Sequence, residues 1–233
     1  ISKMRKFNEF TIQRQLLAIV GTLPIFGWIT TSVIYPMTQK YRHSARLEER
    51  EGYSLVSLQP AITAEIAMQA GSHAEALIRG KEQLNGYTEG GNSRLKEVET
   101  VSPTTVKKVT AAEAIDQDPL ILLSDRFNKD PHQGLFVIAY TLASSYTRSL
   151  LGKPNNPYIK LREKDREMVA VRSFWGYPTP RKIHKEEEVF KKLLDRDGYA
   201  YDNMYVAEYS PPWTFYFLRH NELVVPLKKS NPL

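Results

Sequence analysis

The longest run of apolar residues lies near the start of the chain, over residues 15–39, and contains no Asp, Glu, Lys or Arg. A helix of this length rises about 1.5 Å per residue and spans roughly 37 Å, enough to cross a hydrocarbon core about 30 Å thick. Tyr35 and Tyr41 lie at its far end, where amphipathic rings suit the headgroup region. We therefore predict a single transmembrane helix here, kinked at Pro24. A buried core helix and a retained signal peptide are the alternative interpretations.

The segments around this run define the predicted domain organisation. Residues 1–14 form a basic lead, and residues 40–51 are charged and are predicted to extend the helix beyond the membrane until Gly52 ends it. One folded domain is expected over residues 52–228, followed by a short tail over residues 229–233.

Within the predicted domain, alternating or continuous apolar residues mark eight segments as strands. These segments are residues 53–58, 62–68, 101–109, 135–142, 158–162, 168–174, 204–209 and 222–227. The run over residues 135–142 is apolar almost throughout, which is typical of a central strand.

Two helices are predicted between these strands. Ser72 and Glu75 have the spacing of a capping box and open a helix that ends by Gly86. Thr179 is a predicted N-cap with Pro180 at the first helical position, and this helix runs to about residue 196. Because the two halves share one plan of strands, helix and glycine stop, we predict an antiparallel α+β domain with a curved sheet and two helices.

The composition adds little that is specific. The formal charge is +6 and the pI is about 9.3, and basic residues flank the apolar run on both sides. Headgroup anchoring explains this distribution, so we predict no nucleic-acid partner and leave the membrane orientation open. The chain has no cysteine, which excludes disulfides, iron–sulfur ligation and thiolate zinc sites.

Two motifs in the second half resemble the SOUL haem-binding protein family. They are Met168-Val-Ala-Val-Arg-Ser-Phe-Trp-Gly-Tyr177, and Tyr209-Ser-Pro-Pro-Trp-Thr214 followed by Phe217-Leu-Arg-His-Asn-Glu-Leu223. The resemblance covers roughly residues 48–228. It implies a distorted antiparallel β-barrel of eight or nine strands with two helices, and a non-catalytic module that binds haem or other porphyrins. A membrane span is not part of the usual family pattern.

Several positions depart from what the resemblance implies for haem binding. Ser57 occupies the position of a histidine proposed as a haem ligand in some members, and Ile78, Gly86 and Thr214 occupy positions that are basic in others. The residues that remain for a tetrapyrrole pocket are, on the first helix, Leu77, Ile78, Arg79, Lys81 and Leu84 and, after the second motif, Trp213, Phe215 and Phe217. The apolar members of this set either line a pocket for a flat ligand or belong to the core.

No catalytic or metal-binding constellation is predicted. The five histidines are His43, His73, His132, His184 and His220, and no two have the spacing of a metal site. His73 and His184 fall in the first turn of their helices, which is an exposed position in most proteins. His220 lies inside the second motif.

These observations predict a membrane-anchored, non-catalytic accessory subunit of a larger organellar complex, of a respiratory or photosynthetic type. Its expected partners are membrane lipid and the other subunits, and no cofactor is required. The mitochondrial inner membrane is favoured over the thylakoid, and a removed targeting peptide is one explanation for a chain that begins at Ile1. The alternative is a membrane-tethered protein that binds or carries haem or another tetrapyrrole.

Overall fold

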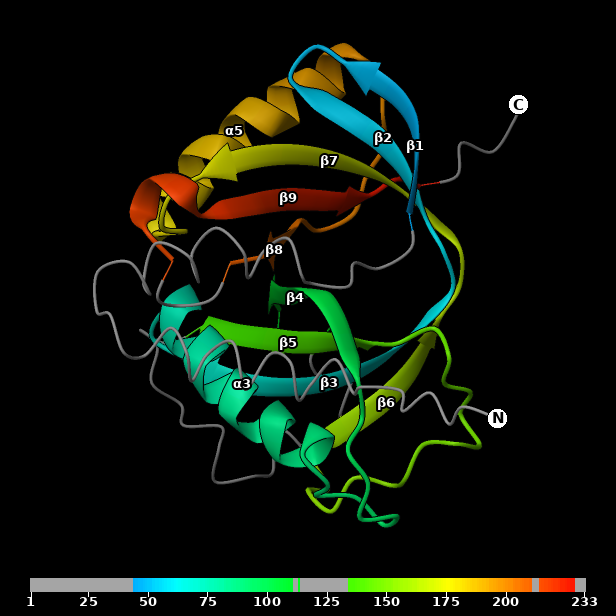
Figure 1. The fold of residues 1–233 in the computed structure, drawn as a ribbon. Helices are drawn as coiled ribbons and strands as arrows, with labels where there is room; N and C mark the ends of the chain where they lie inside the picture. The colour runs from blue at the N-terminus through cyan, green and yellow to red at the C-terminus, as the bar shows by residue number, and fades with distance from the viewer. Residues whose placement is uncertain (1–43, 111–112, 114–133, 211–213, 229–233) are drawn as a thin grey trace, which may run out of the picture.

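The computed structural model in Figure 1 describes residues 44–110, 113, 134–210 and 214–228. Within these ranges nine strands pair antiparallel in one sheet, in the order β1-β2-β7-β9-β8-β4-β5-β3-β6. The strands are β1 (Ser44–Arg50), β2 (Tyr53–Leu58), β3 (Ala61–Ala70), β4 (Thr100–Val109), β5 (Gly134–Leu142), β6 (Ile159–Lys164), β7 (Glu167–Trp175), β8 (Tyr205–Glu208) and β9 (His220–Pro226). The predicted central strand is confirmed, because β5 lies between β4 and β3.

Both predicted helix starts are confirmed. Helix α3 (His73–Thr88) begins after Ser72, whose Oγ accepts the backbone N–H of Glu75 at 3.2 Å. Helix α5 (Pro180–Arg196) begins after Thr179, whose Oγ accepts the backbone N–H of Lys182 at 3.3 Å. A short 3₁₀ helix, η2 (Tyr216–Leu218), precedes β9.

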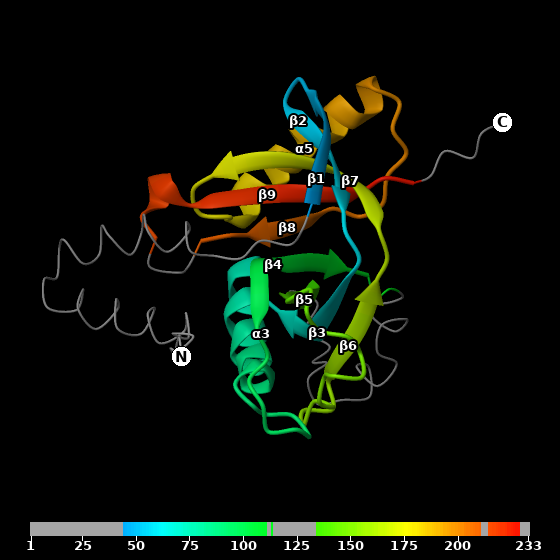
Figure 2. The same cartoon turned by 45° about the vertical axis from the view of Figure 1, so that its right-hand side comes forward.

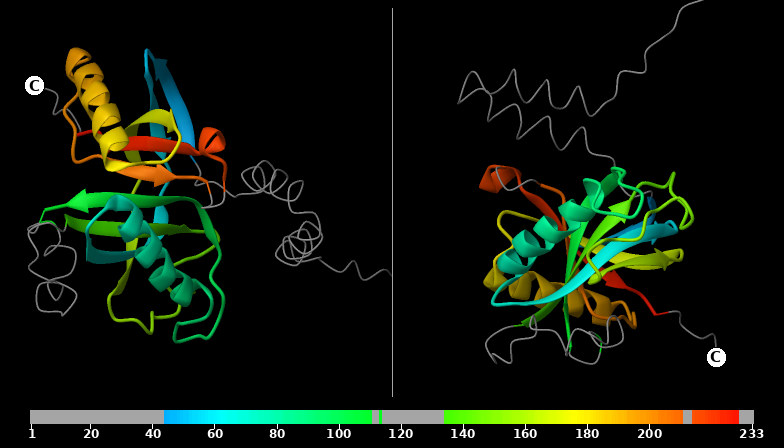
Figure 3. Two further views of the ribbon diagram at one scale, coloured as in Figure 1. Left: turned by 90° about the vertical axis from the view of Figure 1, so that its left-hand side faces the viewer. Right: turned by 90° about the horizontal axis from the view of Figure 1, so that it is seen from below.

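Each helix covers one half of the sheet. The left view of Figure 3 shows α5 against the half that contains β7 and β9, and α3 against the half that contains β5 and β3. Two hydrophobic clusters form beneath them. Leu84 and Ile138 are fully buried in the cluster under α3, and Phe190 and Leu223 are fully buried in the cluster under α5.

Two continuous stretches of chain join the halves. Figure 2 shows β2 running on into β3, and β6 running on into β7, along one side of the molecule. The pairing continues across both junctions, because β2 pairs with β7 and β3 pairs with β6. At the other side the halves meet where β8 pairs with β4.

The predicted fold class is wrong. The sheet is open, because its order ends in the edge strands β1 and β6, and it does not form the predicted closed barrel. Among the described residues, no helix has both the length and the apolar character needed to cross a membrane. The predicted transmembrane helix, residues 15–39, and the basic lead lie outside the described residues.

The predicted helix extension over residues 40–51 is also wrong where the structure describes it. Residues 44–50 form the edge strand β1, which turns at Gly52 (φ +85°) and pairs with β2. Its many charged residues are compatible with a helix by propensity, but they suit an edge strand equally well, because charges discourage pairing with another chain. Residues 44–50 form a strand and not a helix because they pair with β2, a contact that local propensity does not predict.

Candidate functional site

The predicted tetrapyrrole residues of α3 lie on different sides of the helix. Leu77 and Leu84 face inward and belong to the hydrophobic cluster under α3. Ile78 lies on the opposite side of the helix, with 65% of its surface exposed. The two leucines therefore serve the core, which was one of the two interpretations of the sequence.

The contacts of the remaining predicted positions are local ones. Arg79 donates to the Glu75 carboxylate at 2.9 Å and to the carbonyl of Gln69 at 3.1 Å, so its charge is used within its own helix and at the end of β3. Phe215 stacks on Phe217 with ring centroids 5.7 Å apart, and Phe217 is 68% exposed. Trp213 lies outside the described residues.

Lys81 lies beside a buried polar cluster that the sequence did not reveal. The cluster consists of His73 from α3, Glu208 from β8 and Arg219, each less than a tenth exposed. Glu208 lies 3.5 Å from the Nδ1 of His73 and 3.7 Å from the Nη2 of Arg219. The Arg219 guanidinium also lies 4.9 Å from the ring centre of Tyr177.

Burial sets the protonation of this cluster. Desolvation lowers the pKa of His73 to about 4 and raises the pKa of Glu208. Desolvation also lowers the pKa of Lys81, against the attraction of the Glu208 carboxylate. The prediction that His73 is exposed is wrong, because the first turn of α3 docks onto the end of β8.

A groove lies on the face of the sheet opposite the helices. Its narrow part has a volume of about 370 Å³ and its wide part about 660 Å³. The two parts share Thr105, Thr141 and Tyr205 in their walls, so they adjoin each other. In the narrow part, residues of β1 and β2 lie opposite residues of β4 and β5, because the sheet is strongly curved.

Small side chains explain why this face is hollow. Alternate residues of each strand point to the same face, so one cross-strand row of the sheet can be followed through the pairing register. The row runs through Glu65, Ala139, Thr105, Ala207 and Glu222. Its three central members are Ala or Thr, which leave room, and its two end members are carboxylates.

An aromatic row closes the narrow part of the groove. His220 lies between Tyr209 and Trp175, with ring centroids 5.0 and 5.2 Å away respectively. His220 is opposite Trp175 in the pairing of β7 with β9. The Tyr209 hydroxyl donates to Oε2 of Glu222 at 2.5 Å, and the Nε2 of His220 lies 3.7 Å from Oε1 of the same carboxylate. Burial lowers the pKa of His220, against the opposing effect of Glu222.

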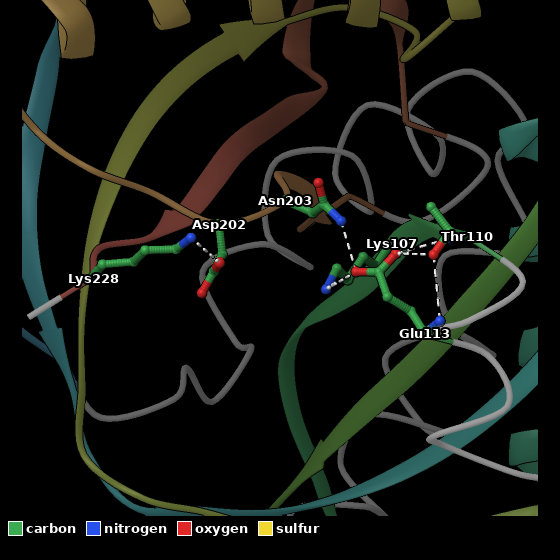
Figure 4. Close-up of polar contacts among 6 residues, drawn as sticks. All are labelled: Lys107, Thr110, Glu113, Asp202, Asn203 and Lys228. Atoms are coloured by element: carbon green, nitrogen blue, oxygen red, sulfur yellow. Dashed lines mark hydrogen bonds and ion pairs between the residues drawn. The ribbon is translucent and has the colours of Figure 1, made fainter.

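Paired charges line the wide part. Lys107 lies 3.4 Å from Glu113, and Asn203 donates to the same carboxylate at 2.6 Å (Figure 4). Lys228 binds Asp202 at 3.2 Å (Figure 4). Lys164 binds the buried Glu65 at 2.9 Å. Hydrogen bonds, chiefly from the backbone of Thr110, lower the pKa of Glu113 to about 2.

The sequence contained part of the signal for this groove. His220 and Tyr209 both belong to the second motif, and the alternation of β9 places His220 and Glu222 on one face. The missing information was that Trp175, 45 positions earlier, lies opposite His220. Among the described residues, no group of three or more His, Asp or Glu side chains is arranged to hold a bare metal ion.

Solved structures with a similar fold are distant in sequence. The C-terminal domain of EcmrR matches with a TM-score of 0.51 and 10% identity, covering 81% of this chain and 98% of that one. EcmrR in its DNA complex matches with a TM-score of 0.53 and 9% identity, covering 95% and 70%. A hydrolase from Listeria innocua matches with a TM-score of 0.50 and 10% identity, covering 85% and 98%. At these identities the likeness shows a shared fold only.

The search of curated proteins gave no match. The family model described as SOUL heme-binding protein matches residues 38–226, which is most of the chain and includes every described strand and helix. The chain belongs to the SOUL haem-binding protein family.

Proposed function

We propose that this protein binds haem or a closely related tetrapyrrole, without catalysing a reaction, in the groove opposite the helices. The observation that carries the proposal is the aromatic row of Tyr209, His220 and Trp175 at one end of a groove whose walls are partly apolar. Membership of the SOUL family supports the ligand class. We place the ligand in this groove and not in the predicted pocket on α3, because Leu77 and Leu84 belong to the core and Ile78 faces solvent.

The groove offers apolar and aromatic surface in its narrow part and lysines in its wide part. Val56, Val171 and Val224 provide apolar surface in the narrow part, and the aromatic rings provide faces for offset stacking on a flat macrocycle. The lysines of the wide part would hold the carboxylates of the ligand. Lys228 and Asp202 are both more than half exposed, and such pairs contribute only about 0–1 kcal/mol, so Lys228 can exchange its partner at low cost.

The test is a titration of the full chain with haemin, followed by the Soret band, with two matched variants. Ser173 is exposed in the narrow part, next to Glu222 in the cross-strand row, so Ser173→Tyr fills the groove without disturbing the core. Lys185→Tyr adds the same side chain on the exposed surface of α5. We expect Ser173→Tyr to weaken binding at least about tenfold, or 1.4 kcal/mol, and Lys185→Tyr to bind like the unmodified protein.

Two results would contradict the proposal. If haemin gives no Soret shift with the full chain, the protein is not a tetrapyrrole binder. If both variants bind haemin with unchanged affinity, the groove is not the site.

A second candidate is the accessory subunit predicted from the sequence. The observation in its favour is the exposure of Trp175, Tyr216 and Phe217, each more than half exposed, because aromatic residues are enriched at protein interfaces. Native electrophoresis of the source material separates the two candidates. Migration in a large complex, with no Soret absorption from the isolated chain, supports the subunit. A small species with its own Soret band supports the haem-binding protein.

A further inference from the structure

We propose that His220 would supply the protein ligand to the haem iron and that Glu222 orients its ring. The inference rests on the proposed function. In some relatives a histidine is proposed as the haem ligand, but this chain has Ser57 at that position, and it has Ile78 where others have a basic residue. A ligand for the iron must therefore come from another position, and the inference names it. A histidine imidazole is a common haem ligand, and its geometry is set by groups around it.

His220 lies in the wall of the groove and is held there by its neighbours. It is the first residue of β9 and lines the narrow part, with 30% of its side chain exposed. Its backbone N–H is fixed by the Ser210 hydroxyl at 3.1 Å. The rings of Tyr209 and Trp175 lie on either side of it and limit its rotation. A ring held in this way is ready to bind without first being ordered.

Glu222 would determine which ring nitrogen remains for the iron. The Nε2 of His220 lies 3.7 Å from Oε1 of Glu222, so a small rotation brings one ring N–H into a hydrogen bond with the carboxylate. Histidines that bind metals almost always donate their other N–H to such a group. The Tyr209 hydroxyl, which donates to the second oxygen of Glu222, keeps the carboxylate in place. The imidazole would then supply a neutral nitrogen ligand to the iron of a bound haem.

The other described histidines lack this placement. His73 is buried against Glu208 on the helix side and lines neither part of the groove. His184 lies on the exposed surface of α5. Tyr209 is the competing oxygen ligand in the groove, but its hydroxyl proton is committed to Glu222.

The experiment uses the full chain loaded with haemin, with absorption and electron paramagnetic resonance spectra of the bound iron. We expect His220→Ala to shift the Soret band, to remove the spectral signature of imidazole ligation and to weaken binding at least about tenfold. Added free imidazole should restore the original spectrum, which a merely structural role of His220 would not allow. His184→Ala is the control and should leave the spectra unchanged.

The outcomes separate this inference from the proposed function. If the unmodified protein takes up haemin and His220→Ala gives the same spectra, His220 is not the ligand and the haem-binding proposal stands. If the unmodified protein gives no Soret shift, the proposed function itself fails. Glu222→Gln gives a second, independent test. This variant should keep His220 as the ligand but change the absorption spectrum of the bound haem. An unchanged spectrum would show that Glu222 does not orient the ring. Far-UV circular dichroism of each variant shows whether it is folded.

Discussion

At the scale of single residues, the burial of His73 has a measurable consequence. The folded protein keeps this imidazole neutral, because burial lowers its pKa to about 4 from 6.5. Between these values the unfolded chain binds a proton that the folded protein excludes. Stability contributed by His73 is therefore present above about pH 6.5 and is lost as the pH falls toward 4.

We expect His73 to reduce the free energy of unfolding by up to roughly 3 kcal/mol over this range, at 1.36 kcal/mol per pKa unit. Burial raises the pKa of Glu208, whose effect on the pH dependence has the opposite sign and offsets part of this loss. Urea unfolding at several pH values, compared between the unmodified protein and His73→Gln, isolates the histidine. The variant should be less sensitive to pH, and parallel pH profiles would contradict the prediction. His184→Gln, at an exposed position of α5, is the matched control.

At the scale of elements, the close approach of α3 to the sheet depends on Gly80. A Cβ added at this position would lie 2.6 Å from Cγ1 of Ile138, a residue of β5 that is fully buried. The helix therefore packs with its backbone almost against the strand. A larger residue at Gly80 must push α3 away from β5, whose Phe136 and Ile138 belong to the same buried cluster.

We expect Gly80→Ala to destabilise the protein by roughly 1–3 kcal/mol through overpacking, measured by urea or thermal unfolding. Gly86→Ala is the control in the same helix, because an added Cβ there meets nothing within 4 Å. That change should be neutral or stabilise by up to about 1 kcal/mol, since Ala is the better helix former. Equal effects of the two changes would show that helix propensity, and not the contact with Ile138, controls both.

At the scale of the whole molecule, the hydrophobic cores of the two halves approach each other at a pair of buried valines. Val106 of β4 is opposite Val206 of β8, and the first belongs to the cluster under α3 while the second belongs to the cluster under α5. The seam is short, with three paired positions. Because the cores meet here, loss of packing at one valine should destabilise both halves.

We expect Val206→Ala to reduce the free energy of unfolding by roughly 1–3 kcal/mol. Circular dichroism and tryptophan fluorescence should still report one common transition. Val189→Ala, at a position of α5 that is 37% exposed, should change stability by no more than about 0.5 kcal/mol. Two separate transitions in Val206→Ala would show that the halves fold independently and that the seam does not couple them.

The sequence by itself determined the elements whose signals are local. The cap at Ser72, the Thr179–Pro180 start of α5 and the apolar run of β5 each depend on neighbouring residues only, and all three agree with the structure. The family signature also lies in the sequence and predicted the family correctly. The charged residues before Gly52 gave no such signal, because an exposed helix and an edge strand have the same polar composition.

Only the tertiary structure decided which strands pair, that the sheet stays open, and what its curved face brings together. Tyr209, His220 and Trp175 come from three different segments, and the strand register alone places their rings in one row. The same holds for His73 and Glu208, which are 135 positions apart yet lie 3.5 Å from each other. Periodicity shows which face of a strand is apolar, but pairing between distant segments depends on packing over the whole sheet, and no local pattern contains that information.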